Sequence, residues 1–295
     1  MAEVRIAVAS GKGGTGKTTV AASLAWVWNA PVVAADLDVE EPNLHLFLRP
    51  RITGRRTAEL EVPVADESLC TACGACAELC QFKAVSLLGE VLLTFPEMCH
   101  GCGGCLAVCP AGALSAGRRE LGEVSWGAAG EIGFVMGRLR VGEAMSPPLM
   151  RAVHRRLQEM LGRRPADVIV DAPPGVSCPA LAAVAGADLI LMVTEPTPFG
   201  LYDLRLAHQA FSPLGVPLAV VVNRAGLGER GVYRFCREVG LPVLAEIPYH
   251  RRLAETYCQG RPVAAAGGEV QGWFQELARR ARELAAGERK ETAHA

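Results

Sequence analysis

The segment Ser10-Gly-Lys-Gly-Gly-Thr-Gly-Lys-Thr-Thr19 decides the fold class of this chain. It follows an apolar run at residues 4–10, typical of a buried strand, and it precedes a helical pattern at residues 17–27. A glycine-rich turn between a strand and a helix lets backbone N–H groups surround phosphate oxygens, and the helix N-terminus adds partial positive charge. The segment therefore predicts a P-loop rather than a plain turn.

The loop residues have distinct expected roles. Lys17 can reach the β- and γ-phosphates of a nucleotide, and the Thr18 hydroxyl can ligate Mg²⁺. A second lysine, Lys12, departs from the ordinary P-loop pattern. The residues expected to line the nucleotide are Gly11, Gly13, Gly14, Thr15, Gly16, Lys17, Thr18 and Thr19.

Apolar runs and helical patterns alternate along the rest of the chain. Further strands are expected at residues 31–38, 131–140, 167–171, 189–194, 218–223 and 243–247. Helices are expected at residues 146–161, 202–214, 231–239 and 273–286. This alternation predicts an α/β fold with a doubly wound, mostly parallel sheet covered on both faces.

Together with Asp36-Leu-Asp38 and Asp167-Val-Ile-Val-Asp171, the two-lysine loop resembles the MinD/ParA/Mrp group of P-loop ATPases. The resemblance covers residues 4–48 and about 130–285. It implies ATP binding, Mg²⁺-dependent hydrolysis that is slow without a partner, and an ATP-dependent homodimer. It further implies that Lys12 crosses the dimer interface to the partner's nucleotide.

The same resemblance assigns further site residues. Asp38 matches the position that activates the attacking water. Asp36 supports it and would also hold Mg²⁺ through water. Asp171 would meet Mg²⁺ through water, and Gly175 would sense the γ-phosphate. A helix cap or turn residue is the structural alternative for each acid. The adenine site would comprise Asn223, Arg224 and Pro248, although a buried structural asparagine is an alternative for Asn223.

Eight of the eleven cysteines form two runs within residues 70–109. Each run has the spacing C-x₂-C-x₂-C-x₃-C, which is typical of bacterial ferredoxins with two [4Fe–4S] clusters. In that pattern the fourth cysteine of each run ligates the other cluster. Zinc, the rival metal, does not need eight cysteines in this crossed pattern. The predicted ligand sets are Cys70, Cys73, Cys76 and Cys109 for the first cluster, and Cys99, Cys102, Cys105 and Cys80 for the second.

The cysteine-rich block interrupts the strand–helix alternation, so it is predicted to be an inserted, small α+β ferredoxin-like domain at residues 62–115. Residues 1–61 and 116–295 would form the discontinuous ATPase domain, with residues 49–61 as a linker. Cys178 lies where the nitrogenase iron protein, a member of the resembled group, ligates a cluster. A buried structural thiol is the alternative there, and Cys236 and Cys258 are expected to be structural.

Composition excludes several classes of function. The net charge is −1, which gives no support for nucleic-acid binding, although Arg49, Arg51, Arg55 and Arg56 raise that alternative. No signal peptide and no transmembrane helix are expected, so the chain is predicted to be cytoplasmic. The apolar stripe of the C-terminal helix is expected to pack on the sheet rather than on a membrane.

These expectations combine into an ATP-binding iron–sulfur protein whose nucleotide state is coupled to cluster redox chemistry or to binding of a redox or iron–sulfur protein partner. The coupling is expected because the insertion leaves the sheet after Asp36–Asp38 and returns before Asp171. An iron–sulfur carrier ATPase of the Mrp type and a positioning ATPase of the MinD/ParA type are the alternatives. The carrier alternative is less favoured, because the chain lacks the C-terminal CxxC motif of Mrp-type carriers.

Overall fold

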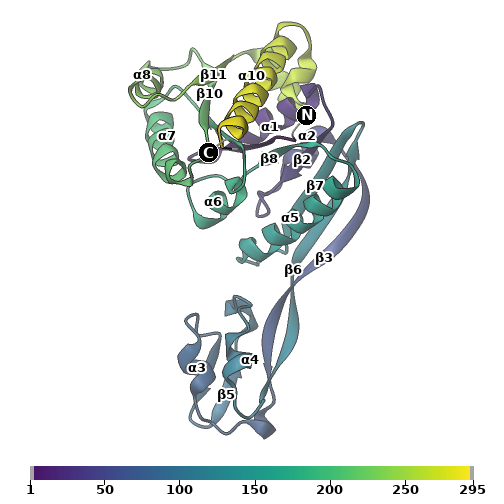
Figure 1. The fold of residues 1–295 in the computed structure, drawn as a ribbon, viewed down its shortest axis with the longest axis vertical. Coiled ribbons are helices and arrows are strands. Elements are labelled where there is room, and N and C mark those ends of the chain that lie inside the picture. Colours follow the sequence, from purple (N-terminus) through teal and green to yellow (C-terminus); the bar gives the residue numbers. More distant parts are fainter. Residues whose placement is uncertain (1–2, 293–295) are drawn as a thin grey trace. The chain divides into compact units, whose positions relative to one another are not determined.

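The computed structural model describes residues 3–292. The strands of its large sheet are β1 (Arg5–Ala9), β2 (Val32–Asp36), β3 (Arg51–Ala65), β6 (Leu114–Ala129), β7 (Ile132–Leu139), β8 (Asp167–Asp171), β9 (Leu189–Thr194), β10 (Leu218–Ala225) and β11 (Val243–Pro248). They lie in the order β11-β10-β9-β1-β8-β2-β7-β6-β3. Most of these strands are labelled in Figure 1. The position of β1 between β8 and β9 requires crossover connections, as in doubly wound sheets.

The strands around β1 are parallel. β1 pairs with β8 and β9, β2 pairs with β8 and β7, and β10 pairs with β9 and β11. The register places Ile6 opposite Ile169, and Asp36 opposite both Asp171 and Met136. Since parallel strands end at the same edge of a sheet, the loop after β1 and the acids after β2 and β8 share that edge. The predicted α/β class with a mostly parallel sheet is confirmed.

The chain divides into two compact units. The first unit comprises Met1–Arg55, Val124–Arg138 and Met150–Ala295, and the second comprises Arg56–Glu123 and Leu139–Leu149. Strands β3 and β6 contribute residues to both units. The second unit contains the predicted insertion at residues 62–115 and extends beyond it on both sides.

Helices cover both faces of the parallel sheet. The principal helices are α1 (Lys17–Val27), α2 (Leu44–Leu48), α5 (Ser146–Arg163), α6 (Cys178–Val184), α7 (Pro198–Phe211), α8 (Gly231–Glu238), α9 (Arg251–Cys258) and α10 (Gly268–Thr292). One core cluster joins Ile6 and Val8 of β1 to Leu24 of α1 and Phe274 of α10. Helices α6 and α7 pack on β1 and β9 with buried residues outside that cluster. The strands are continuously apolar because both of their faces are buried.

The second unit repeats one structural pattern twice. The short 3₁₀ helices Glu67–Leu69 and Pro96–Met98 each precede the first cysteine of a run, and α3 (Ala75–Leu79) and α4 (Gly104–Val108) each lie within a run. An antiparallel pair, β4 (Val85–Leu88) and β5 (Val91–Thr94), follows the first run. The repeat in sequence is therefore also a repeat in structure, while the ferredoxin-like fold of this unit stays a prediction.

The prediction of a linker at residues 49–61 was wrong, because most of it belongs to β3. The 16-residue strand β6 was also not predicted over most of its length. The two strands run antiparallel, since Thr53 bonds to Trp126 while Glu59 pairs with Arg118. Most side chains in the first half of β3 are exposed, so the apolar alternation that identifies a half-buried strand is missing there.

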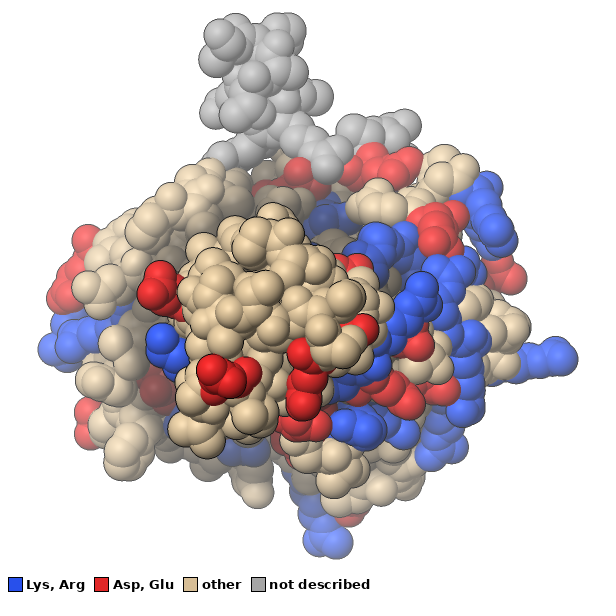
Figure 2. Space-filling model, turned by 90° about the horizontal axis from the view of Figure 1, so that it is seen from below, with Lys and Arg blue, Asp and Glu red and all other residues tan. Residues whose placement is uncertain are grey.

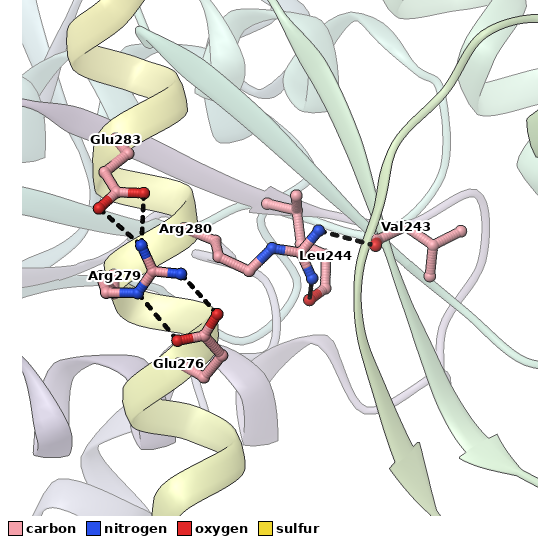
Figure 3. Close-up of polar contacts among 6 residues, drawn as sticks. All are labelled: Val243, Leu244, Glu276, Arg279, Arg280 and Glu283. Carbon is pink, nitrogen blue, oxygen red and sulfur yellow. Dashed lines mark hydrogen bonds and ion pairs between the residues drawn. The ribbon is translucent and has the colours of Figure 1, made fainter.

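The C-terminal helix α10 packs on the sheet through its apolar stripe, as expected, with Phe274 and Leu277 buried. Arg280 donates to the carbonyl of Leu244 in β11, and the exposed Arg279 pairs with a glutamate one turn away on either side (Figure 3). One side of the helix is therefore packed against the sheet, and its exposed side carries ion pairs within the helix. Within residues 3–292, no helix is long and apolar enough to cross a membrane.

Candidate functional site

The loop between β1 and α1 requires glycine at two positions, Gly11 and Gly16. Gly16 has a φ of 93° and forms the N-cap of α1. A Cβ atom at Gly16 would collide with the side-chain amide of Asn223, and one at Gly11 would collide with the backbone carbonyl of Asp203. The loop is therefore held closely between the end of β10 and helix α7.

Lys17 occupies the first turn of α1 and is 6% exposed. Its Nζ atom lies 2.6 Å from Oδ1 of Asp171 and 3.6 Å from Oδ2 of Asp38. Burial acts to lower the pKa of Lys17, but the neighbouring carboxylates, Asp171 first, outweigh it and raise the pKa above its ordinary value. Lys17 therefore stays charged and serves as the counter-ion of the acidic sheet edge.

Asp36 is fully buried beneath this ion pair. Its carboxylate accepts hydrogen bonds from the N–H groups of Asp38 at 3.1 Å and Leu44 at 3.0 Å. Burial, followed by the charge of Asp171, raises the pKa of Asp36 well above its ordinary value. Burial also raises the pKa of Asp38, to about 6. The three predicted acids thus converge on Lys17 and compete for its single charge.

Two buried oxygen atoms at this edge have no hydrogen-bond partner within the described residues: Oγ1 of Thr15 and Oδ2 of Asp171. Buried polar atoms are nearly always paired, so such atoms at a site point to a missing ligand. The N–H of Gly175 donates to the Ser10 carbonyl at 2.9 Å, which ties the predicted phosphate sensor to the loop. The buried, unpaired carboxylate oxygen of Asp171 fits a hydrated divalent cation.

The residues predicted for the base also lie beside the loop. Nδ2 of Asn223 donates to the Thr15 carbonyl at 2.7 Å. Arg224 adopts a left-handed φ of 53° and pairs with Glu195 at 2.6 Å. Such a conformation is strained for a residue other than glycine and is found mostly at functional sites. Pro248 lies opposite the end of β10 in the sheet, while base recognition itself stays a prediction.

The Lys12 side chain contacts two residues of helix α7 in the same chain. Its Nζ atom lies 3.5 Å from a carboxylate oxygen of Asp203 and 5.8 Å from the ring centroid of Phe199. Both partners belong to α7, and Phe199 is 76% exposed. Sequence reasoning missed Asp203, Phe199 and Glu195, because each lies within or near a helical segment that carries no recognised motif.

In the second unit, a cavity of about 80 Å³ is lined by the four cysteines of the second predicted set. Cys99 is buried, Cys80 and Cys105 are partly buried, and Cys102 is exposed. Cys80 comes from the first run, so the structure brings together residues of both runs as the crossed pattern requires. The other lining residues are mainly apolar, with Phe82 and His100 among them.

The cysteines of the first predicted ligand set also lie close to one another. Cys76 is buried in a small apolar cluster, and Cys70 and Cys109 pack against it, as do Cys80 and Cys105 of the second set. Burial raises the pKa of the Cys76 thiol, and the nearby thiols of Cys109 and Cys73 raise it further. Proximity of Cys109, from the second run, to Cys76, from the first, is again the crossed arrangement.

Among the described residues, no three His, Cys, Asp or Glu side chains lie close enough together to share a single metal ion. The other cysteines occupy different environments. Cys178 is exposed as the first residue of α6, and Cys258 is exposed at the end of α9. Cys236 is buried, and burial raises its pKa to about 11. The structural role expected for a buried thiol thus fits Cys236, whereas Cys178 and Cys258 face solvent.

Comparisons with known proteins agree with this geometry. The chain is 28% identical over 282 residues to MJ0579, an uncharacterized protein of Methanocaldococcus jannaschii, covering 92% of this chain and 96% of the relative. It is 32% identical over 232 residues to MJ0578 of the same organism, covering 76% and 79% of the two chains. The septum site-determining protein MinD of Pyrococcus horikoshii, complexed with Mg-ADP, has a similar fold, with a TM-score of 0.60 and 20% identity. That comparison covers 96% of this chain and 98% of the solved one.

The family model of the CobQ/CobB/MinD/ParA nucleotide binding domain matches residues 6–263, a span that includes every site residue discussed above. Its match begins in β1 and ends just after the adenine-site candidates. The chain therefore belongs to the CobQ/CobB/MinD/ParA family of nucleotide-binding domains.

Proposed function

We propose that this chain is a Mg²⁺-dependent ATPase that dimerises with ATP and couples its nucleotide state to two [4Fe–4S] clusters in the second unit. The observation that carries the nucleotide part is the buried Lys17 ammonium between Asp171 and Asp38, beside two unpaired oxygens. The carboxylates of Asp171 and Asp38 surround the Lys17 ammonium, which phosphate oxygens would contact in a nucleotide complex. The ammonium is thus already desolvated and positioned where a phosphate would bind.

Each residue at the sheet edge then has a role in hydrolysis. Lys17 and the loop N–H groups bind and orient the β- and γ-phosphates. Thr18 and the free oxygen of Asp171 would hold Mg²⁺, which supplies charge neutralisation for the developing negative charge. Asp38, at the family's position for water activation, orients the attacking water and accepts its proton. Asp36 is fully buried and fixes the backbone of Asp38 through its hydrogen bond.

The dimer part of the proposal concerns Lys12 and the surface beside it. Lys12 is one third exposed, and next to it α7 presents the largely exposed rings of Phe199 and Tyr202. Exposed aromatic side chains beside a charged site are typical of a contact surface. A second copy of the chain would cover these rings, and Lys12 would exchange Asp203 for the phosphates of the partner.

The iron–sulfur part rests on the donor set and its spatial grouping. Four cysteine side chains line one cavity, and they come from both runs, as two four-iron clusters would need. A [4Fe–4S] cube holds its thiolates farther apart than a single ion does, because each thiolate binds a different iron atom. The clusters would supply one-electron redox chemistry, and the chain's part is to hold them in a largely apolar setting.

The coupling part follows from chain connectivity. Strand β7 pairs with β2 at Asp36 and then continues into Leu139–Leu149, a segment that belongs to the second unit. In that segment Glu143 forms a buried ion pair with Arg119 of β6, and Met145 packs against the cluster that contains Cys99. A change at the nucleotide-binding edge can therefore reach the second cysteine set along β7.

Anaerobic purification followed by iron analysis, EPR and ATPase assays tests the proposal. We expect about eight iron atoms per chain and a slow, Mg²⁺-dependent ATPase. Cys73→Ser should lose about half of the iron and keep the ATPase, while the matched control Cys258→Ser, outside both runs, should keep both. Stoichiometric zinc with almost no iron would reject the clusters, and cluster potentials identical with ATP and ADP would reject the coupling.

A MinD/ParA-like positioning ATPase is the second candidate function, because the fold of MinD from Pyrococcus horikoshii matches over nearly the whole chain. In that case the second unit would act as a passive attachment. Nucleotide-dependent localisation in cells that survives the loss of all eight run cysteines would favour this candidate.

A further inference from the structure

Two aromatic rings stack over the second cysteine set. The ring centroids of Phe82 and His100 are 3.4 Å apart, and their planes differ by 9°. Both side chains are exposed and both line the cavity that holds Cys80, Cys99, Cys102 and Cys105. Cys102 is itself exposed. The stack is therefore an exposed part of the wall of the cavity that these thiols line.

The internal repeat shows that this arrangement is specific to the second set. His100 follows the first cysteine of the second run, and the matching residue of the first run is Thr71. Phe82 lies two residues after the fourth cysteine of the first run, and the matching residue of the second run is Ala111. The two sets are thus equivalent in their cysteines and differ in the surface around them.

The surface of this unit is both acidic and apolar. Residues 62–115 contain five aspartates and glutamates, one lysine and no arginine, a net charge of −4. Of the nineteen large apolar side chains found exposed among the described residues, nine belong to this segment. Figure 2 shows the face of this unit as a broad uncharged area with scattered carboxylates. An apolar contact area with acidic surroundings fits a partner with basic surroundings.

We propose that the Phe82–His100 stack is the contact point at which the second cluster exchanges electrons with a basic one-electron carrier protein. This rests on the clusters of the proposed function. One electron passes from the reduced cluster to the oxidised carrier, and no bond or proton is transferred. The stacked rings form an exposed aromatic surface against which the carrier packs, and the carboxylates of the unit steer its approach.

The test uses the full, iron-loaded chain and cytochrome c, a basic haem protein, as the carrier probe. The double variant Phe82→Ala/His100→Thr gives the second site side chains like those of the first. We expect the second-order rate of cytochrome c reduction to fall about tenfold, with unchanged iron content and ATPase activity. Reduction of ferricyanide, a small acceptor that needs no docking, should keep its rate. The matched control is Leu88→Ala, which removes a side chain that is 72% exposed and outside the cavity lining.

Two further measurements keep the proposal falsifiable if the double variant loses iron. Raising the ionic strength should slow cytochrome c reduction by the wild-type chain about tenfold. Glu78→Lys leaves both rings in place and should both slow the reaction and weaken its salt dependence. A wild-type rate in the iron-loaded double variant, or no effect of salt and of Glu78→Lys, would overturn the proposal. A wild-type chain without iron would instead reject the proposed function.

Discussion

Replacing Lys17 with methionine should destabilise the nucleotide-free protein, although no nucleotide contact is present to be lost. The Lys17 ammonium is the counter-ion of a buried acidic edge, 2.6 Å from Asp171 and 3.6 Å from Asp38. Asp36 and Asp171 are completely buried. Without the ammonium, these carboxylates have to share the same low-dielectric space with no opposing charge.

The magnitude follows from the burial of the pair. Removing one partner of a buried ion pair costs about 3–5 kcal/mol. Methionine keeps most of the volume of the lysine stem, so little is added for a cavity. Asp36, whose pKa burial already raises, can relieve part of the repulsion by binding a proton. We therefore expect the free energy of unfolding to fall by about 3 kcal/mol at pH 7.5.

Urea unfolding of nucleotide-free protein in EDTA measures this loss. Lys12→Met is the matched control, because the Lys12–Asp203 pair is partly exposed and should contribute less than about 1 kcal/mol. Adding Asp171→Asn to Lys17→Met should restore at least about half of the lost stability, since it removes one of the uncompensated charges. If Lys17→Met costs no more than Lys12→Met, the lysine is not the counter-ion of this edge.

The remaining predictions concern the dimer and the water-activating acid. Lys12→Ala should keep nucleotide binding and lose ATP-dependent dimerisation, which analytical ultracentrifugation with a non-hydrolysable ATP analogue measures; an unchanged dimer would show that Lys12 does not act across the interface. Asp38→Asn should stop hydrolysis and raise the free energy of unfolding by about 1 kcal/mol at pH 7.5. An acid whose pKa is raised by folding, here to about 6, costs stability once it ionises, so the gain should fade as the pH falls through 6 toward 4. A gain that is the same at pH 5 and pH 7.5 would contradict this.

The parallel sheet and its functional edge were predictable because their signals are local. Strands β8 and β9 begin and end at the predicted residues, and α1 occupies its predicted span. A buried parallel strand is continuously apolar, and the glycine-rich loop between β1 and α1 has a fixed length and chemistry. Once the strand order is known, the acids of β2 and β8 must lie side by side at one edge.

The long ribbon of β3 and β6 was not predictable for a physical reason. Strand β3 lies at the edge of the sheet, next to β6 alone, and most side chains in the half nearest Arg51 are exposed. Few positions there need apolar residues, so the sequence carries no clear period of two. The sequence also did not predict that Leu139–Leu149 belongs to the second unit. Within that unit, Glu143 of this segment pairs with Arg119, and no spacing rule in the sequence reveals such a pair.

Both lysines of the loop form ion pairs with carboxylates of their own chain, and these pairs compete with ligand binding. A phosphate that takes Lys17 must displace Asp171 and Asp38, and a divalent cation that takes Asp171 releases Lys17 for the phosphate. Each ligand therefore removes a competitor of the other, so Mg²⁺ and nucleotide should reinforce one another's binding by the same factor. Lys12 is not part of this competition, because its carboxylate partner is Asp203. In the proposed dimer, a second copy of the chain would supply another anion and so release Lys12 from Asp203. The proposal therefore predicts that Lys17 responds to the nucleotide of its own site and that Lys12 responds to dimerisation.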